Sequence, residues 1–196
     1  DTEGEEYQQE IDEVRRRLNQ TAELGIPYAI AGPPLGSVDF QLGAQQYAKL
    51  LEVGREFGVQ TIMEYLGFSD EVNTIEAALQ VMDGSGDPTA TTVLDPFHCF
   101  RGGGSIESIS KLTSEQIAIS HFNDSPTDPP REQQHDPDRV MPGDGIVDLK
   151  RYCDLLREVG YDRWLSLELF RPDLWEQDPR DVCREGLEKM QEVAES

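Results

Sequence analysis

The stretch Ile117–Gly145 reads IAISHFNDSPTDPPREQQHDPDRVMPGDG. It begins as a short apolar run that leads to His121 and Asp124, and it continues as a long polar loop that carries Arg139. Many α/β enzymes present reactive groups in this way, because a buried strand holds them rigidly and the loop at its carboxyl end surrounds them. The loop is longer than an ordinary connection, so we expect it to be either functional or disordered.

Strands and helices alternate about five times along the chain. Apolar residues spaced three and four apart predict helices, for example Ile11, Val14 and Leu18. Short apolar runs bounded by turn residues predict strands. The predicted strands are 26–31, 59–66, 91–94, 117–120 and 164–169, and the predicted helices are 5–24, 39–57, 74–82, 106–112, 148–159 and 180–193. This order indicates an α/β fold with a parallel sheet, either a barrel or an open, doubly wound sheet.

The composition is that of a globular chain with a strongly acidic surface. The 196 residues are 37% hydrophobic and 29% charged, and 17 basic against 39 acidic residues give a net charge of −22. The charge fits a highly solvated surface or a salt-adapted source. Phosphates would be repelled, so we expect neither a nucleic-acid partner nor binding to an anionic membrane, and no apolar run is long enough to cross a bilayer.

The three cysteines are Cys99, Cys153 and Cys183, which lie far apart and form no C-x-x-C pair. This odd, dispersed set predicts neither a disulfide framework nor a zinc ribbon, and it suits a reducing cytoplasm. Cys99 adjoins His98 and could be reactive, but we expect it to be a small buried residue of the core.

Four predicted strands end in an acidic residue or a histidine, namely Glu64, Asp95, His121 and Glu168. The carboxyl ends of all strands of a parallel barrel lie on one face, so these side chains are expected to converge. Three carboxylates and an imidazole suit one divalent metal ion (Mn²⁺, Co²⁺, Zn²⁺ or Mg²⁺) and leave positions open for substrate. Each residue alone would more simply cap a helix or pair with an arginine, but the four together predict a metal site.

Two residues near this set could contact the metal ligands or the substrate. His98 follows Asp95 by three positions, so both side chains can face one cavity. Asp124 can hold the ring N–H of His121 or bind a substrate hydroxyl.

Arg139 is the basic residue late in the long loop, just before a Pro-Gly turn. It can cover the site as a lid residue and bind a hydroxyl, carbonyl or carboxylate of the substrate. The alternative is a surface salt bridge with Asp136 or Asp138. His135 lies among polar residues of the loop and is expected to be solvated.

Several motifs follow one another in a recognisable order. They are IMEYLG at 62–67, VNTIEAA at 72–78, DPFH at 95–98, HFND at 121–124, DRVMPGDG at 138–145 and SLELFRP at 166–172. In order and spacing they resemble the sugar phosphate isomerase/epimerase superfamily, which is the xylose isomerase-like TIM barrel group. The likeness covers about residues 20–193 and is closest to the 2-keto-myo-inositol (inosose) isomerases.

The resemblance implies a TIM (β/α)8-type barrel with one divalent metal ion. Its metal ligands would be Glu64, Asp95, His121 and Glu168, and the two glutamates would also act as acid and base on either side of the substrate. His98 and Arg139 resemble substrate-contacting residues of the family. Endonuclease IV shares the barrel, but it uses several metals and further histidines, whereas this chain has three histidines in all.

The chain departs from the family in its number of strands. The family barrel has eight strands in about 250 residues, whereas about five βα units are visible here, matching the fourth to the eighth. We therefore expect residues 1–196 to form a single barrel domain that is N-terminally incomplete, through truncation or an incomplete gene model. The open sheet would expose two apolar edges, so the chain is expected to be unstable alone or to associate, for example as a homo-oligomer.

The expected function is a divalent-metal-dependent isomerase or epimerase of a small polyhydroxy ketone, either a sugar or a keto-inositol. One of Glu64 and Glu168 would remove a proton beside the carbonyl to give an enediolate, and the other would return a proton to the adjacent carbon. Two alternatives remain open. A dehydratase would expel a β-hydroxyl from the same enediolate, and a partial barrel without catalysis would serve as a partner subunit.

Overall fold

Five parallel strands form one sheet within residues 3–195, the part of the chain that this computed structural model describes. The strands pair in chain order and are β1 (Tyr28–Ala31), β2 (Gln60–Met63), β3 (Thr92–Leu94), β4 (Ile117–Phe122) and β5 (Leu165–Leu167). A doubly wound sheet reverses its strand order at a switch point, and this sheet does not. The fold is therefore the expected α/β partial barrel of five units, and the doubly wound alternative is wrong.

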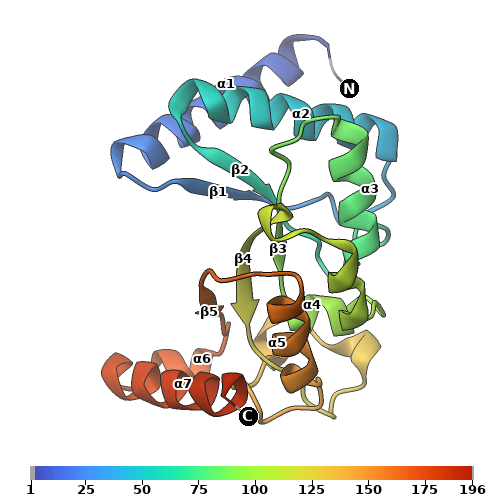
Figure 1. The fold of residues 1–196 in the computed structure, drawn as a ribbon. Helices are drawn as coiled ribbons and strands as arrows, with labels where there is room; N and C mark the ends of the chain where they lie inside the picture. Colours follow the sequence, from blue (N-terminus) through green and yellow to red (C-terminus); the bar gives the residue numbers. More distant parts are fainter. Residues whose placement is uncertain (1–2, 196) are drawn as a thin grey trace.

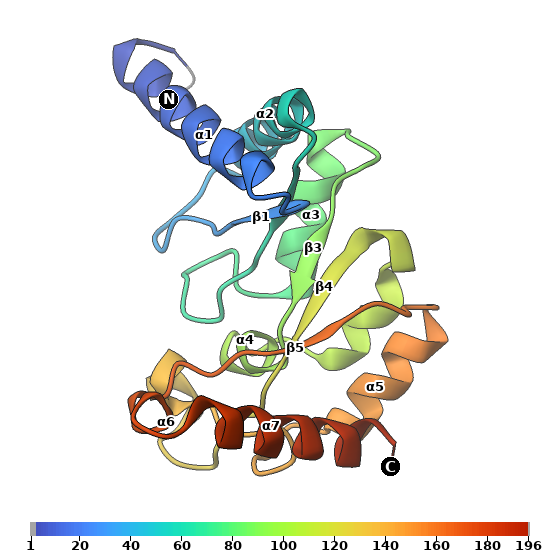
Figure 2. The ribbon, with the colours of Figure 1, turned by 90° about the vertical axis from the view of Figure 1, so that its left-hand side faces the viewer.

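Helices connect successive strands and cover one side of the sheet. They are α1 (Glu5–Glu23), α2 (Phe40–Phe57), α3 (Ile75–Ser85), α4 (Pro96–Arg101), α5 (Leu149–Glu158), α6 (Pro172–Trp175) and α7 (Pro179–Ala194). Figure 1 shows α2, α3 and α5 along one side, with β1 and β5 bordering the opposite, open side, and Figure 2 gives the perpendicular view. The sheet thus has the curvature and helix placement of a barrel wall.

The long helices begin and end at the signals that the sequence contains. Asp39 caps α2 by accepting hydrogen bonds from the backbone N–H groups of Gln41 and Leu42, and Thr74 caps α3. Helix α2 ends at Gly58, whose φ of 67° is the left-handed conformation that glycine adopts without a steric penalty. These caps fix where β2 starts and so where its carboxyl end lies.

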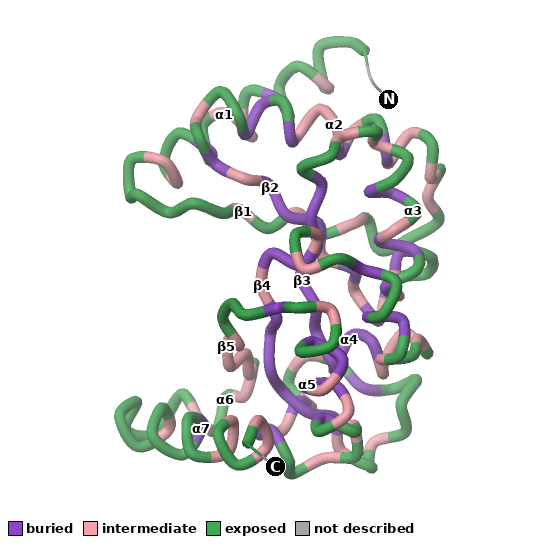
Figure 3. Tube along the Cα trace, in the orientation of Figure 1, coloured by how far each residue is buried: buried purple, intermediate pink, exposed green. Residues whose placement is uncertain are grey.

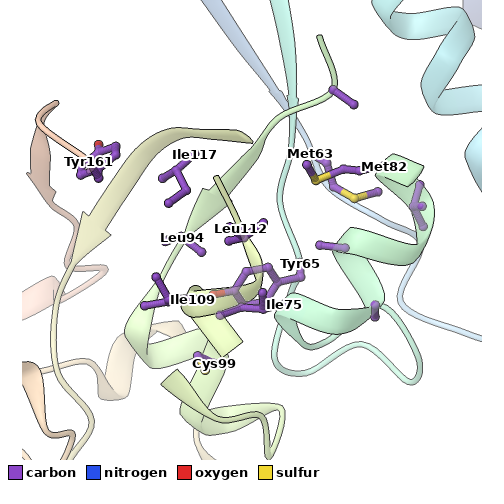
Figure 4. Packing of buried hydrophobic residues seen from close by; sticks show 14 of the residues in the cluster. Met63, Tyr65, Ile75, Met82, Leu94, Cys99, Ile109, Leu112, Ile117 and Tyr161 are labelled. Carbon is purple, nitrogen blue, oxygen red and sulfur yellow. The ribbon is translucent and has the colours of Figure 1, made fainter. Parts of the chain in front are cut away.

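Most of the core lies between the strands and the helices. Figure 3 shows the buried residues concentrated along β2, β3 and β4, whereas α1 and α7 are largely exposed. Figure 4 shows Met63 and Tyr65 together with Ile75 and Met82 of α3, and all four belong to one cluster of buried apolar residues. The opposite face of the sheet carries a smaller buried cluster, which consists of Ile62, Val93 and Ala118.

The open side exposes large apolar side chains, as expected for unpaired edges. Tyr28 and Ile30 of β1 are 42% and 49% exposed, and Trp164 beside β5 is 80% exposed. Each of these two edge strands has a partner on one side only within the described residues. The exposed area provides a physical reason for the chain to associate.

Some predicted boundaries were wrong. The predicted helix at 106–112 is a 3₁₀ helix, Ile106–Lys111, and the last strand spans three residues instead of six. Helices α4 and α6 were not predicted: residues 95–98 and 166–172 were recognised as motifs, but no helix was assigned to them. Both are proline-initiated turns of helix, with proline at the position where its missing N–H costs nothing.

The long loop after β4 follows a defined path and is not a disordered connection. It contains the one-turn 3₁₀ helices Arg131–Gln133 and Asp136–Asp138. Arg101 of α4 donates hydrogen bonds to the carbonyls of Gln134 (2.7 Å) and Glu132 (2.9 Å). The amide of Gln134 donates in turn to the carbonyls of Pro126 and Pro129, both at 2.8 Å. These bonds hold the loop over the carboxyl ends of the strands.

Cys99 and Cys153 are buried and Cys183 is exposed, and all three are free thiols. Cys99 therefore lies in the core, as expected for a small apolar filler. Among the residues that the structure describes, no helix is both long and apolar enough to span a membrane.

Candidate metal centre

Four side chains from four neighbouring strands meet at the carboxyl edge of the sheet. Glu64 follows β2, Asp95 follows β3, His121 lies in β4, and Glu168 follows β5. One potential ligand atom of each lies within 4.8 Å of those of the other three. Asp95 and His121 are buried, and the two glutamates are partly exposed. The structure thus brings together all four residues of the predicted metal site, while their role as ligands remains a prediction.

The Nδ1 atom of His121 points at the three carboxylates. It lies 3.2 Å from Oε1 of Glu64, 3.4 Å from Oδ2 of Asp95 and 3.0 Å from Oε2 of Glu168. Despite these distances, this buried nitrogen makes no hydrogen bond of acceptable geometry. Once the ring has lost its proton, an imidazole nitrogen and three carboxylates that face a common centre are the donor set that a divalent cation requires, so the residues fit such an ion.

Positively charged side chains keep the carboxylates of the cluster ionised. Burial alone would lower the pKa of His121, but the carboxylates of Asp95, Glu168 and Glu64 outweigh it and raise that pKa to about 11. Burial would raise the pKa of Asp95, whereas the positive charge of Arg139 and the interaction with His121 hold it well below its usual range. The carboxylates are therefore ionised, and the positive charge that they need is supplied by neighbouring side chains.

Arg139 is buried and contacts the same carboxylates. Its Nη1 lies 3.1 Å from Oδ2 of Asp95 and forms a short hydrogen bond to Oε2 of Glu168. Its Nη2 donates to Oδ1 of Asp136 at 2.9 Å. The guanidinium carbon lies 4.9 Å from the centre of the Phe97 ring and 5.2 Å from that of Phe170. The ion pair with Asp136 exists, but a buried guanidinium between two aromatic rings is not a surface salt bridge.

His98 lies beside Arg139 at the edge of the cluster. Its Nδ1 accepts the backbone N–H of Gly67 at 3.2 Å. Its Nε2 lies 3.0 Å from Nη2 of Arg139, a hydrogen-bond contact in which the arginine can only donate. Phe68 packs edge-on against the His98 ring at 5.3 Å. The His98 ring is therefore held between the backbone of Gly67 and the guanidinium of Arg139.

Asp124 has a different environment from the one that the sequence suggested. Its carboxylate accepts the backbone N–H groups of Ser125 (2.8 Å), Val147 (3.0 Å), Gly145 (3.1 Å) and Gly143 (3.2 Å). Asp124 also pairs with Val140 through an isolated antiparallel bridge. It therefore ties the two ends of the long loop together, and no hydrogen bond joins it to His121 within the described chain. Its contact with a substrate remains a prediction.

Two residues at the centre had no role in the sequence analysis. Asn123 is buried and donates to Oδ2 of Asp95 at 3.1 Å, and the hydroxyl of Tyr65 contacts the backbone of Asp95. Both belong to motifs that were recognised as segments, IMEYLG and HFND, but no local pattern shows that their side chains turn towards Asp95.

The comparisons with known proteins agree with this geometry. The model of a family described as the xylose isomerase-like TIM barrel matches residues 1–193. The inosose isomerase of Bacillus velezensis is 28% identical over 194 residues, which cover 95% of this chain and 69% of that protein. A 3-dehydroshikimate dehydratase of Pseudomonas putida is 24% identical over 191 residues, which cover 93% of this chain and 29% of that protein.

A solved structure of the IOLI protein, determined with a bound zinc atom, superposes with a TM-score of 0.86. It is 27% identical, and the match covers 94% of this chain and 68% of that chain.

Proposed function

The chain belongs to the xylose isomerase-like TIM barrel family, and from this we propose that it is a divalent-metal-dependent isomerase of a small polyhydroxy ketone, namely a sugar or a keto-inositol. The likeness to inosose isomerases supports the isomerase class and favours a keto-inositol as substrate. The observation that carries the proposal is the convergence of three carboxylates on Nδ1 of His121.

Glu64, Asp95, His121 and Glu168 would hold the cation, whose Lewis acidity would make a C–H bond beside the substrate carbonyl more acidic. Zinc is supported by the zinc-bound relative, whereas Mn²⁺, Co²⁺ and Mg²⁺ are compatible with the donor set.

In this proposal the two glutamates transfer protons on two sides of the substrate. Glu64 follows β2 and Glu168 follows β5, and two strands lie between them in the sheet. Burial would raise the pKa of Glu168, but His121 and Arg139 outweigh it and lower that pKa, so Glu168 is a carboxylate at neutral pH. That is the form a general base requires. One glutamate removes the proton beside the carbonyl, and the other delivers a proton to the adjacent carbon.

Arg139 would orient the substrate through its guanidinium N–H groups, with His98 beside it. The rings of Phe97 and Phe170 lie 4.9 Å and 5.2 Å from the guanidinium carbon, and these contacts would help to hold Arg139 in place before substrate arrives. The loop above them would limit the access of water, which protects an enediolate from side reactions.

Solvent-hydrogen exchange tests the reaction directly. Zinc-loaded protein in deuterated water, given a keto-inositol, should introduce deuterium beside the carbonyl, as measured by mass spectrometry. The Glu168→Gln variant keeps the shape of the side chain but lacks the base, so it should exchange more slowly by about 10²–10⁴-fold. Exchange at the wild-type rate in this variant would remove Glu168 from the mechanism.

A second candidate is a dehydratase on the same site, which the similarity to the Pseudomonas putida enzyme supports. After proton removal, the same carbanion equivalent would lose a β-hydroxyl as water. The mass of the product separates the two reactions, because an isomer has the mass of its substrate and a dehydration product lacks one water.

We further propose that the five units belong to a single barrel domain in which additional parallel strands would join β1 to β5. The exposed apolar side chains on these edges support this closure. Without it, the same edges favour association between copies of the chain, and a partial barrel that serves as a partner subunit remains the non-enzymatic alternative.

A further inference from the structure

The side chain of Asp95 is held by groups outside the four-residue cluster. Its Oδ1 accepts the backbone N–H of His98 at 3.0 Å, which caps helix α4. Its Oδ2 accepts a hydrogen bond from the side-chain amide of Asn123 at 3.1 Å and lies 3.4 Å from Nδ1 of His121. The two oxygens therefore differ in their contacts: Oδ1 caps helix α4, and Oδ2 faces the cluster.

The orientation of the Asn123 amide follows from its second partner. The backbone N–H of Phe97 donates to Oδ1 of Asn123 at 3.0 Å, and an N–H group can only donate. The NH₂ group must then face Asp95. Asn123 is wholly buried, so no water competes for this bond. The amide thus links the first turn of α4 to the oxygen of Asp95 that faces the cluster.

The backbone of Asp95 is held by a buried tyrosine. The Tyr65 hydroxyl donates to the carbonyl of Asp95 at 3.1 Å and accepts its N–H at 3.2 Å. Tyr65 therefore fixes the carboxyl end of β3, where Asp95 leaves the strand.

Tyr47 makes the same pair of bonds at the other end of β3. Its hydroxyl donates to the carbonyl of Thr91 at 2.7 Å and accepts the N–H of Thr91 at 3.1 Å. It contacts none of the four cluster residues through a hydrogen bond in the described chain. Both tyrosines are buried and bond both backbone groups of one residue of this segment, and the Tyr47 hydroxyl also lies 3.3 Å from the carbonyl of Thr61. They differ in that Tyr65 bonds a residue of the cluster and Tyr47 does not.

We propose that Asn123 and Tyr65 are positioning residues that present Asp95 to the cation through Oδ2 alone. The inference rests on the proposed function, because it takes Asp95 to be a metal ligand. A single bound oxygen keeps a coordination position free for substrate, whereas a rotated carboxylate could occupy it with its second oxygen. Partners that orient a ligand in this way are typically worth about 10–100-fold in metal affinity.

The test measures zinc affinity by competition with a chromophoric chelator. The variants are Tyr65→Phe, Asn123→Ala and the control Tyr47→Phe, each compared with the wild-type chain. Unfolding by urea without zinc gives the loss of stability for each. Tyr65→Phe and Asn123→Ala should bind zinc about 10–100-fold more weakly, while Tyr47→Phe should lose comparable stability with an unchanged zinc affinity.

Equal zinc affinity in Tyr65→Phe and Tyr47→Phe, with Asn123→Ala close to wild type, would overturn the inference and leave the proposed function intact. If Asn123→Ala does not fold, the comparison of zinc affinity between Tyr65→Phe and Tyr47→Phe decides alone. A wild-type chain that binds no zinc would overturn the proposed function and this inference together.

Discussion

Nη1 of Arg139 lies 3.1 Å from Oδ2 of Asp95, and the two side chains are 1% and 0% exposed. A buried arginine thus touches a carboxylate that is also assigned to the cation. Burial would lower the pKa of Arg139, but Asp95 and Glu168 outweigh it and raise that pKa, so the guanidinium stays charged. In the absence of metal it supplies part of the positive charge that the carboxylates need.

Replacement of Arg139 by Gln should therefore destabilise the metal-free chain. Removing one partner of a buried ion pair costs about 3–5 kcal/mol, because the other charge is left without compensation. Zinc should restore more stability to this variant than to the wild type, since the cation replaces the missing charge. Urea unfolding with and without zinc measures both effects, and an equal gain from zinc in the two proteins would contradict this account.

Asp124→Asn should loosen the long loop. The carboxylate accepts four backbone N–H groups, and an amide would turn an NH₂ group towards some of them. We expect a loss of about 2–3 kcal/mol in the free energy of unfolding and faster proteolysis within the loop. Unchanged stability together with a raised KM would instead support the substrate contact that the sequence suggested.

The cysteines should differ sharply in reactivity. Burial raises the pKa of the Cys99 thiol to about 12, so it is protonated at pH 8 and inert in the folded chain. Exposed Cys183 should react with iodoacetamide, and Cys99 should react only after unfolding. Raising the pH from 7 to 9 should leave Cys99 unreactive in the folded chain, because both pH values lie below the pKa of its thiol. Peptide mass spectrometry measures labelling, and native labelling of Cys99 as fast as Cys183 would refute the assignment.

Association through the open side should depend on Trp164, which is 80% exposed beside the β5 edge. Trp164→Ser removes apolar area from that edge, so it should shift the chain towards monomers in light scattering coupled to size exclusion. Trp175→Ser is the matched control, because Trp175 is 68% exposed on α6. The same shift in both variants would argue against a role of the edge.

The sequence was sufficient for the units of the fold and for the cluster, since a strand-end acid or histidine depends only on where a strand stops. For this reason the sequence was enough to name Glu64, Asp95, His121 and Glu168. The order of the strands in the sheet could not be predicted from the alternation of elements, which is compatible with both a barrel and a doubly wound sheet. The barrel was predicted from the resemblance to the family.

The sequence pattern also could not predict contacts between segments that lie far apart in the chain. Asp124 was expected to hold the ring N–H of His121 or to bind a substrate hydroxyl, whereas its hydrogen bonds run to backbone groups 19 to 23 positions away and to its neighbour Ser125. Asn123 and Tyr65 act on Asp95 from 28 and 30 positions away. Helix α4 could have been found, because an aspartate cap followed by proline is a start signal.

The central claim is that Glu64, Asp95, His121 and Glu168 together hold one divalent cation. Elemental mass spectrometry of purified protein tests it most directly, beside Glu168→Ala and the control Glu107→Ala, which removes an exposed carboxylate paired with Arg151. We expect about one zinc, manganese or cobalt ion per chain in the wild type and the control, and loss of the ion in Glu168→Ala. No stoichiometric metal in the wild type, even after reloading, would contradict the claim.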